Sequence, residues 1–287
     1  MTGTGVDRPW IVEGMTSRQS TDTSAGDDAG MTTAELLAAA DEALIDAAFC
    51  SGDFDEADRL ASTARRQAEA DGDRPARAAA EVVRGSLLHY RNITSLMNEA
   101  EPAPDDVAAE EAATHRSLEL YQELGDEAGV ARAAFGVGLF EQVLRLDWNA
   151  AMPYYRRSES LIPALEKTGD LYTRSEIHRH LGFYHLVVEN QPETAVGHLR
   201  ISLELREKQD EPRRIPSGLV ALAWAQREAG NPAEAVRLLR RAVSLAREAG
   251  LIPARIADAE RELRESEAEL AKAEAPETAE TPETAEN

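Results

Sequence analysis

Histidine is the residue type that comes nearest to forming a metal site in this sequence. Four of the six histidines lie between positions 178 and 198: His178, His180, His185 and His198. On a helix, His178 and His180 would point to different faces. The seven-residue step from His178 to His185 would span about 10 Å. Neither pair can chelate one ion alone, so the spacing predicts packing roles for these side chains and no bound metal or other cofactor.

Nucleophilic chemistry has little support. Cys50 is the only cysteine, and no base near it in the sequence would activate its thiol. The sequence contains no Gly-rich phosphate loop, no paired cysteines and no zinc-protease motif. A single cysteine cannot form an intrachain disulfide, which is typical of a reducing compartment. We therefore expect Cys50 to be a small buried residue at the end of the first helix of a cytoplasmic protein.

The charge balance limits the possible partners. The chain carries 53 Asp and Glu residues against 31 Lys and Arg residues, for a net charge of −22. Such a field repels phosphate backbones and anionic lipid surfaces. No apolar run approaches the length of a membrane span, and the apolar patch at residues 9–12 is too short for a signal sequence. We expect no nucleic-acid partner and no membrane partner.

These side chains must be positioned by helices. Ala, Leu, Glu and Arg dominate the middle of the chain, and all four favour helix. No segment has the alternation typical of a strand. The predicted helix ends recur about every 40 to 47 residues, at Gly72, Gly125, Gly169, Gln209 and Gly250, except that an insertion at 98–104 lengthens the first step to 53 residues. A repeat of this size predicts an all-α solenoid.

Five helix pairs account for the repeat. They are predicted at 33–50 with 54–71, 75–96 with 105–124, 127–145 with 149–167, 171–189 with 192–208, and 213–229 with 232–249. Thr32 and Glu35 form a capping-box pattern, so we expect the folded part to begin there. The polar segment 1–30 and the acidic tail 274–287 are predicted to be disordered, on either side of a repeat domain at 31–273.

A final helix is predicted at 253–273. Its apolar residues Ile256, Leu263 and Leu270 recur every seven positions on an otherwise charged surface. The narrow stripe favours a helix that caps the end of the array. The same stripe is compatible with a coiled-coil seam in a homodimer.

Short motifs at the helix turns match a known family. The turn Gly52-Asp53-Phe54-Asp55-Glu56-Ala57 resembles the Gly-Asp-Tyr-Glu-Glu-Ala turn of tetratricopeptide (TPR) repeats. Residues 33–250 also carry the Leu-Gly spacing of that family, for example at Leu181-Gly182. The chain thus resembles a TPR protein, similar to the long-repeat arrays of bacterial signal-responsive regulators, without their DNA-binding or NTPase domain. The resemblance implies a right-handed superhelix with small residues, such as Gly182 and Ala57, where helices cross.

The same resemblance implies a ligand groove. In TPR arrays the first helix of each pair lines the concave side. Counting from the family register places ten candidate residues there: Phe49, His89, Tyr90, Arg132, Phe135, Glu176, Arg179, Phe183, Trp224 and Arg227. Each pair contributes one aromatic side chain, and three arginines lie among them. This combination suits a peptide, a protein segment or an acidic small molecule.

We therefore expect a non-catalytic binding module that holds its ligand in a concave groove. One alternative is an enzyme in which Asp46, His89 and Tyr90 supply acid/base groups from adjacent first helices. Another is an oligomeric assembly scaffold that acts through its convex face or its last helix.

Overall fold

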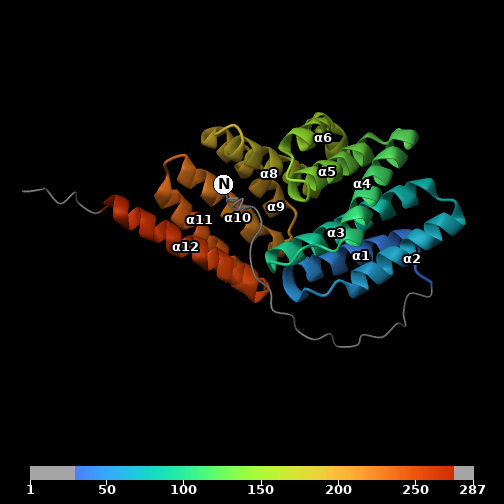
Figure 1. The fold of residues 1–287 in the computed structure, drawn as a ribbon, viewed down its shortest axis with the longest axis horizontal. Coiled ribbons are helices and arrows are strands. Elements are labelled where there is room, and N and C mark those ends of the chain that lie inside the picture. Colours follow the sequence, from blue (N-terminus) through green and yellow to red (C-terminus); the bar gives the residue numbers. More distant parts are fainter. Residues whose placement is uncertain (1–29, 275–287) are drawn as a thin grey trace, which may run out of the picture.

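The computed structural model describes residues 30–274, so the two predicted disordered segments lie outside it except for their boundary residues. Within this range every regular element is a helix (Figure 1), as predicted. The helices are α1 (Thr33–Asp46), η1 (Ala47–Ser51, a π-helical turn), α2 (Asp55–Asp71), α3 (Arg74–Met97), α4 (Pro104–Leu124), α5 (Glu127–Val143), α6 (Trp148–Ser160), α7 (Ile162–Thr168), α8 (Leu171–Val187), α9 (Pro192–Lys208), η2 (Pro212–Arg214, a 3₁₀ turn), α10 (Ile215–Glu228), α11 (Pro232–Glu248) and α12 (Pro253–Glu274). None of these helices is both long enough and apolar enough to cross a bilayer.

Consecutive helices pack in pairs, and each pair packs on the next. The main pairs are α1 with α2, α3 with α4, α5 with α6, α8 with α9 and α10 with α11. The second helix of each pair also contacts the first helix of the following pair. Most helix bounds fall within two residues of the predicted ones. The solenoid-like arrangement expected from the repeat is therefore confirmed.

A Gly-Asp step separates successive pairs among the first four, and each of its two residues has a local role. Gly125 and Gly169 follow helix ends with φ of 68° and 74°, a left-handed conformation that favours glycine. The next residue caps the following helix. Asp126 accepts a hydrogen bond from the Gly129 amide at 3.0 Å, and Asp170 accepts one from the Thr173 amide at 2.9 Å. Each cap satisfies one amide that has no partner within the helix.

Two predicted helices are interrupted. The helix predicted at 149–167 is two helices, because α6 ends at Ser160 and α7 begins at Ile162. Pro163 has no amide hydrogen to continue the ladder, and its ring disfavours helical geometry in the preceding residue. The helix predicted at 33–50 changes to π-helical geometry at Ala47, where the Gly52 amide donates to the Ala47 carbonyl at 2.9 Å.

Small residues lie where helices cross, as expected at Gly182 and Ala57. A Cβ atom on Gly182 would stand 2.7 Å from Cγ of Leu199 on the paired helix. Gly138 is equally constrained, with the Tyr155 ring at 2.8 Å from its would-be Cβ. Ala57 is 1% exposed. Larger residues here would push apart the two helices of a pair.

The array bends far enough for its last helix to meet its first. The Ile252 amide donates to the Phe49 carbonyl at 2.9 Å, and Nε of Arg255 donates to the Ala48 carbonyl at 3.0 Å. An apolar cluster, called here the closure cluster, buries this contact: Ile45, Ala48, Phe49, Ala246 and Leu251. Figure 1 shows the start of α12 beside the N-terminal helices. The contact places the first and last elements of the array around one interior space.

The last helix packs along the end of the array. Leu263 packs against the apolar core shared by α8, α9, α10 and α11, and Ile256 packs against the closure cluster. Two members of the predicted apolar stripe thus contact their own chain, as a capping helix requires.

Candidate functional site

A cavity of about 400 Å³ lies inside the curve of the array. Its lining comes mainly from α3, α5 and α8, with three residues from α4 and one each from α1, η1, α9, α10 and α12. Eight of the ten predicted groove residues line it: Phe49, His89, Tyr90, Arg132, Phe135, Glu176, Arg179 and Phe183. The volume is in the range of sites that bind small organic molecules.

Trp224 and Arg227, the other two predicted groove residues, do not line this cavity. The Trp224 ring packs against Phe183 at 6.0 Å between centroids. Arg227 lies 3.7 Å from carboxylate oxygens of Glu262 and Glu269 on α12. The physical reason is that α12 packs along this end of the array and draws Arg227 towards its own acidic residues.

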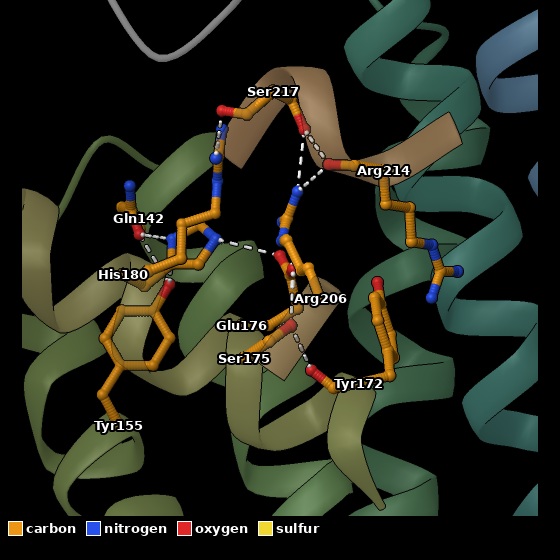
Figure 2. A network of polar contacts seen from close by, with 10 residues as sticks. Gln142, Tyr155, Tyr172, Ser175, Glu176, His180, Arg206, Arg214 and Ser217 are labelled. Carbon is orange, nitrogen blue, oxygen red and sulfur yellow. Dashed lines mark hydrogen bonds and ion pairs between the residues drawn. The ribbon is translucent and has the colours of Figure 1, made fainter. Parts of the chain in front are cut away.

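A buried ion pair crosses the cavity wall between α8 and α9. Arg206, which is 4% exposed, donates from Nη2 to Glu176. Its Nη1 donates to the Arg214 carbonyl at 2.6 Å and to Oγ of Ser217 at 2.8 Å (Figure 2). Desolvation acts to raise the pKa of Glu176, but Arg206 and Arg179 outweigh it and lower that pKa to about 2. Glu176 is therefore ionised at neutral pH.

His180 belongs to a neutral network beside this pair. Its Nδ1 lies 2.7 Å from Oε1 of Gln142, which also accepts a 2.6 Å bond from the Tyr155 hydroxyl (Figure 2). Because that oxygen only accepts, Nδ1 carries the His180 proton. Nε2, 3.9 Å from Glu176, is then the basic nitrogen. Desolvation lowers the pKa of His180 to about 3, so the ring is neutral over the physiological range.

The acid/base group predicted around His89 has a different composition in the structure. Asp46 is exposed at the end of α1 and does not line the cavity. The carboxylate beside His89 belongs to Glu110 on α4, with Oε1 at 2.8 Å from Nδ1 of His89. Asn92 donates to the other oxygen of Glu110 at 2.7 Å. Tyr90 lies next to His89, with ring centroids 6.1 Å apart. A carboxylate at Nδ1 would orient this imidazole for proton transfer.

Arg179 and Arg255 occupy the cavity wall in similar ways. Arg179 donates to the Ser217 carbonyl at 2.8 Å, and its guanidinium lies 4.8 Å from the centre of the Phe183 ring. Arg255, which bonds the Ala48 carbonyl, lies 4.5 Å from the centre of the Phe49 ring. Stacking on an aromatic face favours a guanidinium that has lost water.

Several cavity residues were not predicted. Asp41, Glu110, Tyr172, Arg206 and Arg255 all line the cavity. Glu110 and Arg206 come from second helices, which the family register places outside a groove. Arg255 reaches the cavity only because α12 returns to η1. A signal was available for Arg206, a charged side chain on the apolar face of a helix, since such residues are rarely buried without a partner.

His178, His185 and His198 pack together, as predicted for His178 and His185. The His185 and His198 rings are stacked at 5.2 Å between centroids, and Nδ1 of His178 lies 3.2 Å from Nδ1 of His198. Burial and the neighbouring His198 lower the pKa of His178 to about 4. In the part of the chain that the structure describes, no group of three or more His, Cys, Asp or Glu side chains is arranged to hold a metal ion.

Comparison with known proteins adds no further assignment. No protein-family model matches the sequence, and a search of curated proteins finds no significant relative. The functional argument therefore rests on the cavity.

Proposed function

We propose that this protein is a binding protein that holds a small molecule in the cavity inside its array. The observation that carries the proposal is the contact between α12 and η1, because it brings the two ends of the array together around the space. The cavity walls combine aromatic rings with a few charged groups. That is the usual composition of sites that bind and orient small organic ligands.

The cavity favours a small molecule over a peptide or protein segment. An extended peptide usually runs along an open groove and leaves at both ends. Here the Phe49 and Ala48 carbonyls are hydrogen-bonded to α12, and a volume of about 400 Å³ holds only a compact ligand. A peptide would have to separate η1 from α12 before it could lie along the array.

Native mass spectrometry with a cavity-filling variant tests this proposal. Gly136 lines the cavity, and a Cβ atom there meets only Thr114, at 3.6 Å. We expect the wild-type protein to retain a small molecule from its expression host or from a fragment library. Gly136→Met should lose it by filling the space. Gly197→Met is the matched control, since Gly197 is on α9 with nothing within 4 Å of its would-be Cβ. Equal retention by both variants, or retention only of long peptides, would refute the proposal.

We also propose that the array is of the tetratricopeptide type and serves as a signal-binding module. Support comes from Gly138 and Gly182, which follow Val137 and Leu181 in the family spacing and lie at close helix crossings. A profile built from relatives of this chain should recover small residues at these two positions and at Ala57. A profile in which large residues are common at all three would contradict this assignment.

A second candidate function is proton transfer on the bound molecule. It is favoured by His89, which lines the cavity with only 5% of its surface exposed and with Nδ1 2.8 Å from Glu110. Untargeted mass spectrometry of a metabolite mixture should then show a compound consumed by the wild-type protein and left intact by His89→Gln. A mixture that the wild-type protein leaves unchanged would remove this candidate.

A further inference from the structure

Four arginines and four acidic residues line the cavity, but their charges are not matched one to one. The arginines are Arg132, Arg179, Arg206 and Arg255, and the acids are Asp41, Glu110, Asp170 and Glu176. Arg132 pairs with Asp170 at 2.8 Å, and Arg206 pairs with Glu176. Glu110 is held by His89 and Asn92. These contacts leave Arg179, Arg255 and Asp41 without a direct ion pair.

Asp41 does not neutralise either remaining arginine. Its nearest charged neighbours are Arg214, Glu42, Asp170 and Glu211, and desolvation raises its pKa. Neither Arg179 nor Arg255 is among the groups that act on it most strongly. Neither guanidinium forms a direct ion pair among residues 30–274, although Glu176 acts electrostatically on Arg179 and Asp258 on Arg255.

Arg179 and Arg255 are nevertheless partly buried. Desolvation is the main effect on both: it lowers the pKa of Arg179 to about 10 and also lowers the pKa of Arg255. Each is still charged at neutral pH. Each makes one hydrogen bond to a main-chain carbonyl and stacks on a phenyl ring. A partly desolvated cation without a direct ion pair is costly, and an anion with oxygen acceptors would offset that cost.

Their surroundings match an anion attached to a flat apolar body. The Phe49 and Tyr90 rings meet edge to face at 6.1 Å between centroids, and Phe183 lies under Arg179. Tyr90 acts electrostatically on both guanidiniums, and Arg255 acts on Arg179. These groups thus form one neighbourhood of the cavity, made by α3, η1, α8 and α12.

We propose that the cavity binds a small molecule through a carboxylate or phosphate group held jointly by Arg179 and Arg255, with an aromatic or similarly flat body against Phe49, Tyr90 and Phe183. This inference rests on the proposed function, since it names the class of ligand for the same cavity. The anion would bridge α8 to α12, and it would therefore also stabilise the contact between the last and first elements of the array.

Calorimetric titration with three probes tests the inference without any mutation. Benzoate and phenyl phosphate carry the two candidate anions, and benzamide is a neutral analogue of benzoate. We expect one or both anions to bind at least about 10-fold more tightly than benzamide, the step expected for hydrogen bonds to a charged partner. The tighter of the two anions identifies the group that the site takes. Equal binding of all three probes, or no binding of either anion, would overturn the inference.

Substitutions of Arg179 and Arg255 test where in the cavity the anion binds. Arg179→Met and Arg255→Met should each weaken binding of the tighter anion by about 10- to 100-fold, with helicity preserved by circular dichroism. Arg145→Met is the matched control, because Arg145 also stacks on a phenyl ring, at 5.2 Å from the centre of Phe140, but lies outside the cavity. If Arg255→Met fails to fold because its hydrogen bond to Ala48 is lost, Arg255→Lys takes its place. The lysine keeps the charge and should retain part of the affinity. Unchanged affinity in folded Arg179→Met would overturn the inference.

Failure of this inference can be told apart from failure of the proposed function. If benzamide binds as well as benzoate and Gly136→Met abolishes both, the cavity binds small molecules but does not select an oxyanion. If the probes bind Gly136→Met as well as the wild-type protein, they bind elsewhere, and both proposals are refuted.

Discussion

His180 links the stability of the protein to pH. Its pKa is about 3 in the folded chain, because the ring is desolvated, against an ordinary value of 6.5. As the pH falls below about 6.5, the unfolded chain takes up a proton that the folded chain does not. Stability is therefore lost as the pH falls, by about 1.4 kcal/mol per pH unit for such a group. His178, with a pKa of about 4, acts in the same direction.

We accordingly predict that the melting temperature falls steadily between pH 7 and pH 5. His180→Gln should have a lower melting temperature at pH 7, since its bond to Gln142 is changed, and a shallower decline with pH. His115→Gln, a change outside this network, should keep the wild-type slope. A wild-type slope in His180→Gln, measured by calorimetry across the pH range, would show that His180 does not carry the effect.

At the scale of single elements, the close crossing of α5 and α6 depends on Gly138. A Cβ atom there would stand 2.8 Å from the Tyr155 ring, which is fully buried and bonded to Gln142. The ring cannot move aside without breaking that bond. Glycine is thus required by the packing of two helices, although it is a poor helix former.

Gly138→Ala should therefore destabilise the protein by about 1 to 3 kcal/mol, the usual cost of overpacking a core. Gly197→Ala offers the opposite case, because its added methyl group meets nothing within 4 Å and alanine is favoured in helices by up to about 1 kcal/mol. Urea unfolding of both variants checks the prediction. A neutral Gly138→Ala would mean that α6 shifts at little cost.

The helix boundaries could be predicted because the residues that end one helix and cap the next are close together in the sequence. Gly125 with Asp126, and Gly169 with Asp170, end one helix and cap the next within a few residues, so the sequence pattern determines the boundary. The break before Pro163 could have been predicted from the sequence too, because proline has no amide hydrogen to continue the helix ladder. The family register also placed His89, Tyr90 and Arg179 on the inner side of first helices, and all three line the cavity.

The return of α12 to η1 has no such local signal. It depends on the rotation between successive pairs, summed over the whole array. Arg255 and Arg206 could not be placed at the cavity from sequence, since their neighbours Phe49 and Glu176 approach them only in the folded array. The wrong partner for His89 has a similar origin: Glu110 lies on a second helix, which the register excluded.

At the scale of the whole molecule, the closure cluster holds the two ends together. Leu251, 5% exposed, packs in it with Phe49 and Ala246.

Leu251→Asp would place a charge in this apolar contact, at a cost of several kcal/mol unless the ends separate. We predict that they do separate, with a larger radius of gyration in small-angle X-ray scattering and weaker ligand binding. Leu146→Asp, at a position 38% exposed, should change neither the radius of gyration nor ligand binding. Unaltered scattering from Leu251→Asp would mean that α12 stays in place without this cluster.

An array whose ends touch cannot vary in length as an open solenoid can. Inserting or deleting one helix pair in an open array only lengthens or shortens its surface. In this chain it would carry Arg255 away from Phe49 and leave the space between them without a wall. Selection on the ligand would thus also act on the number of pairs, and duplication of a repeat, tolerated elsewhere, would here abolish binding.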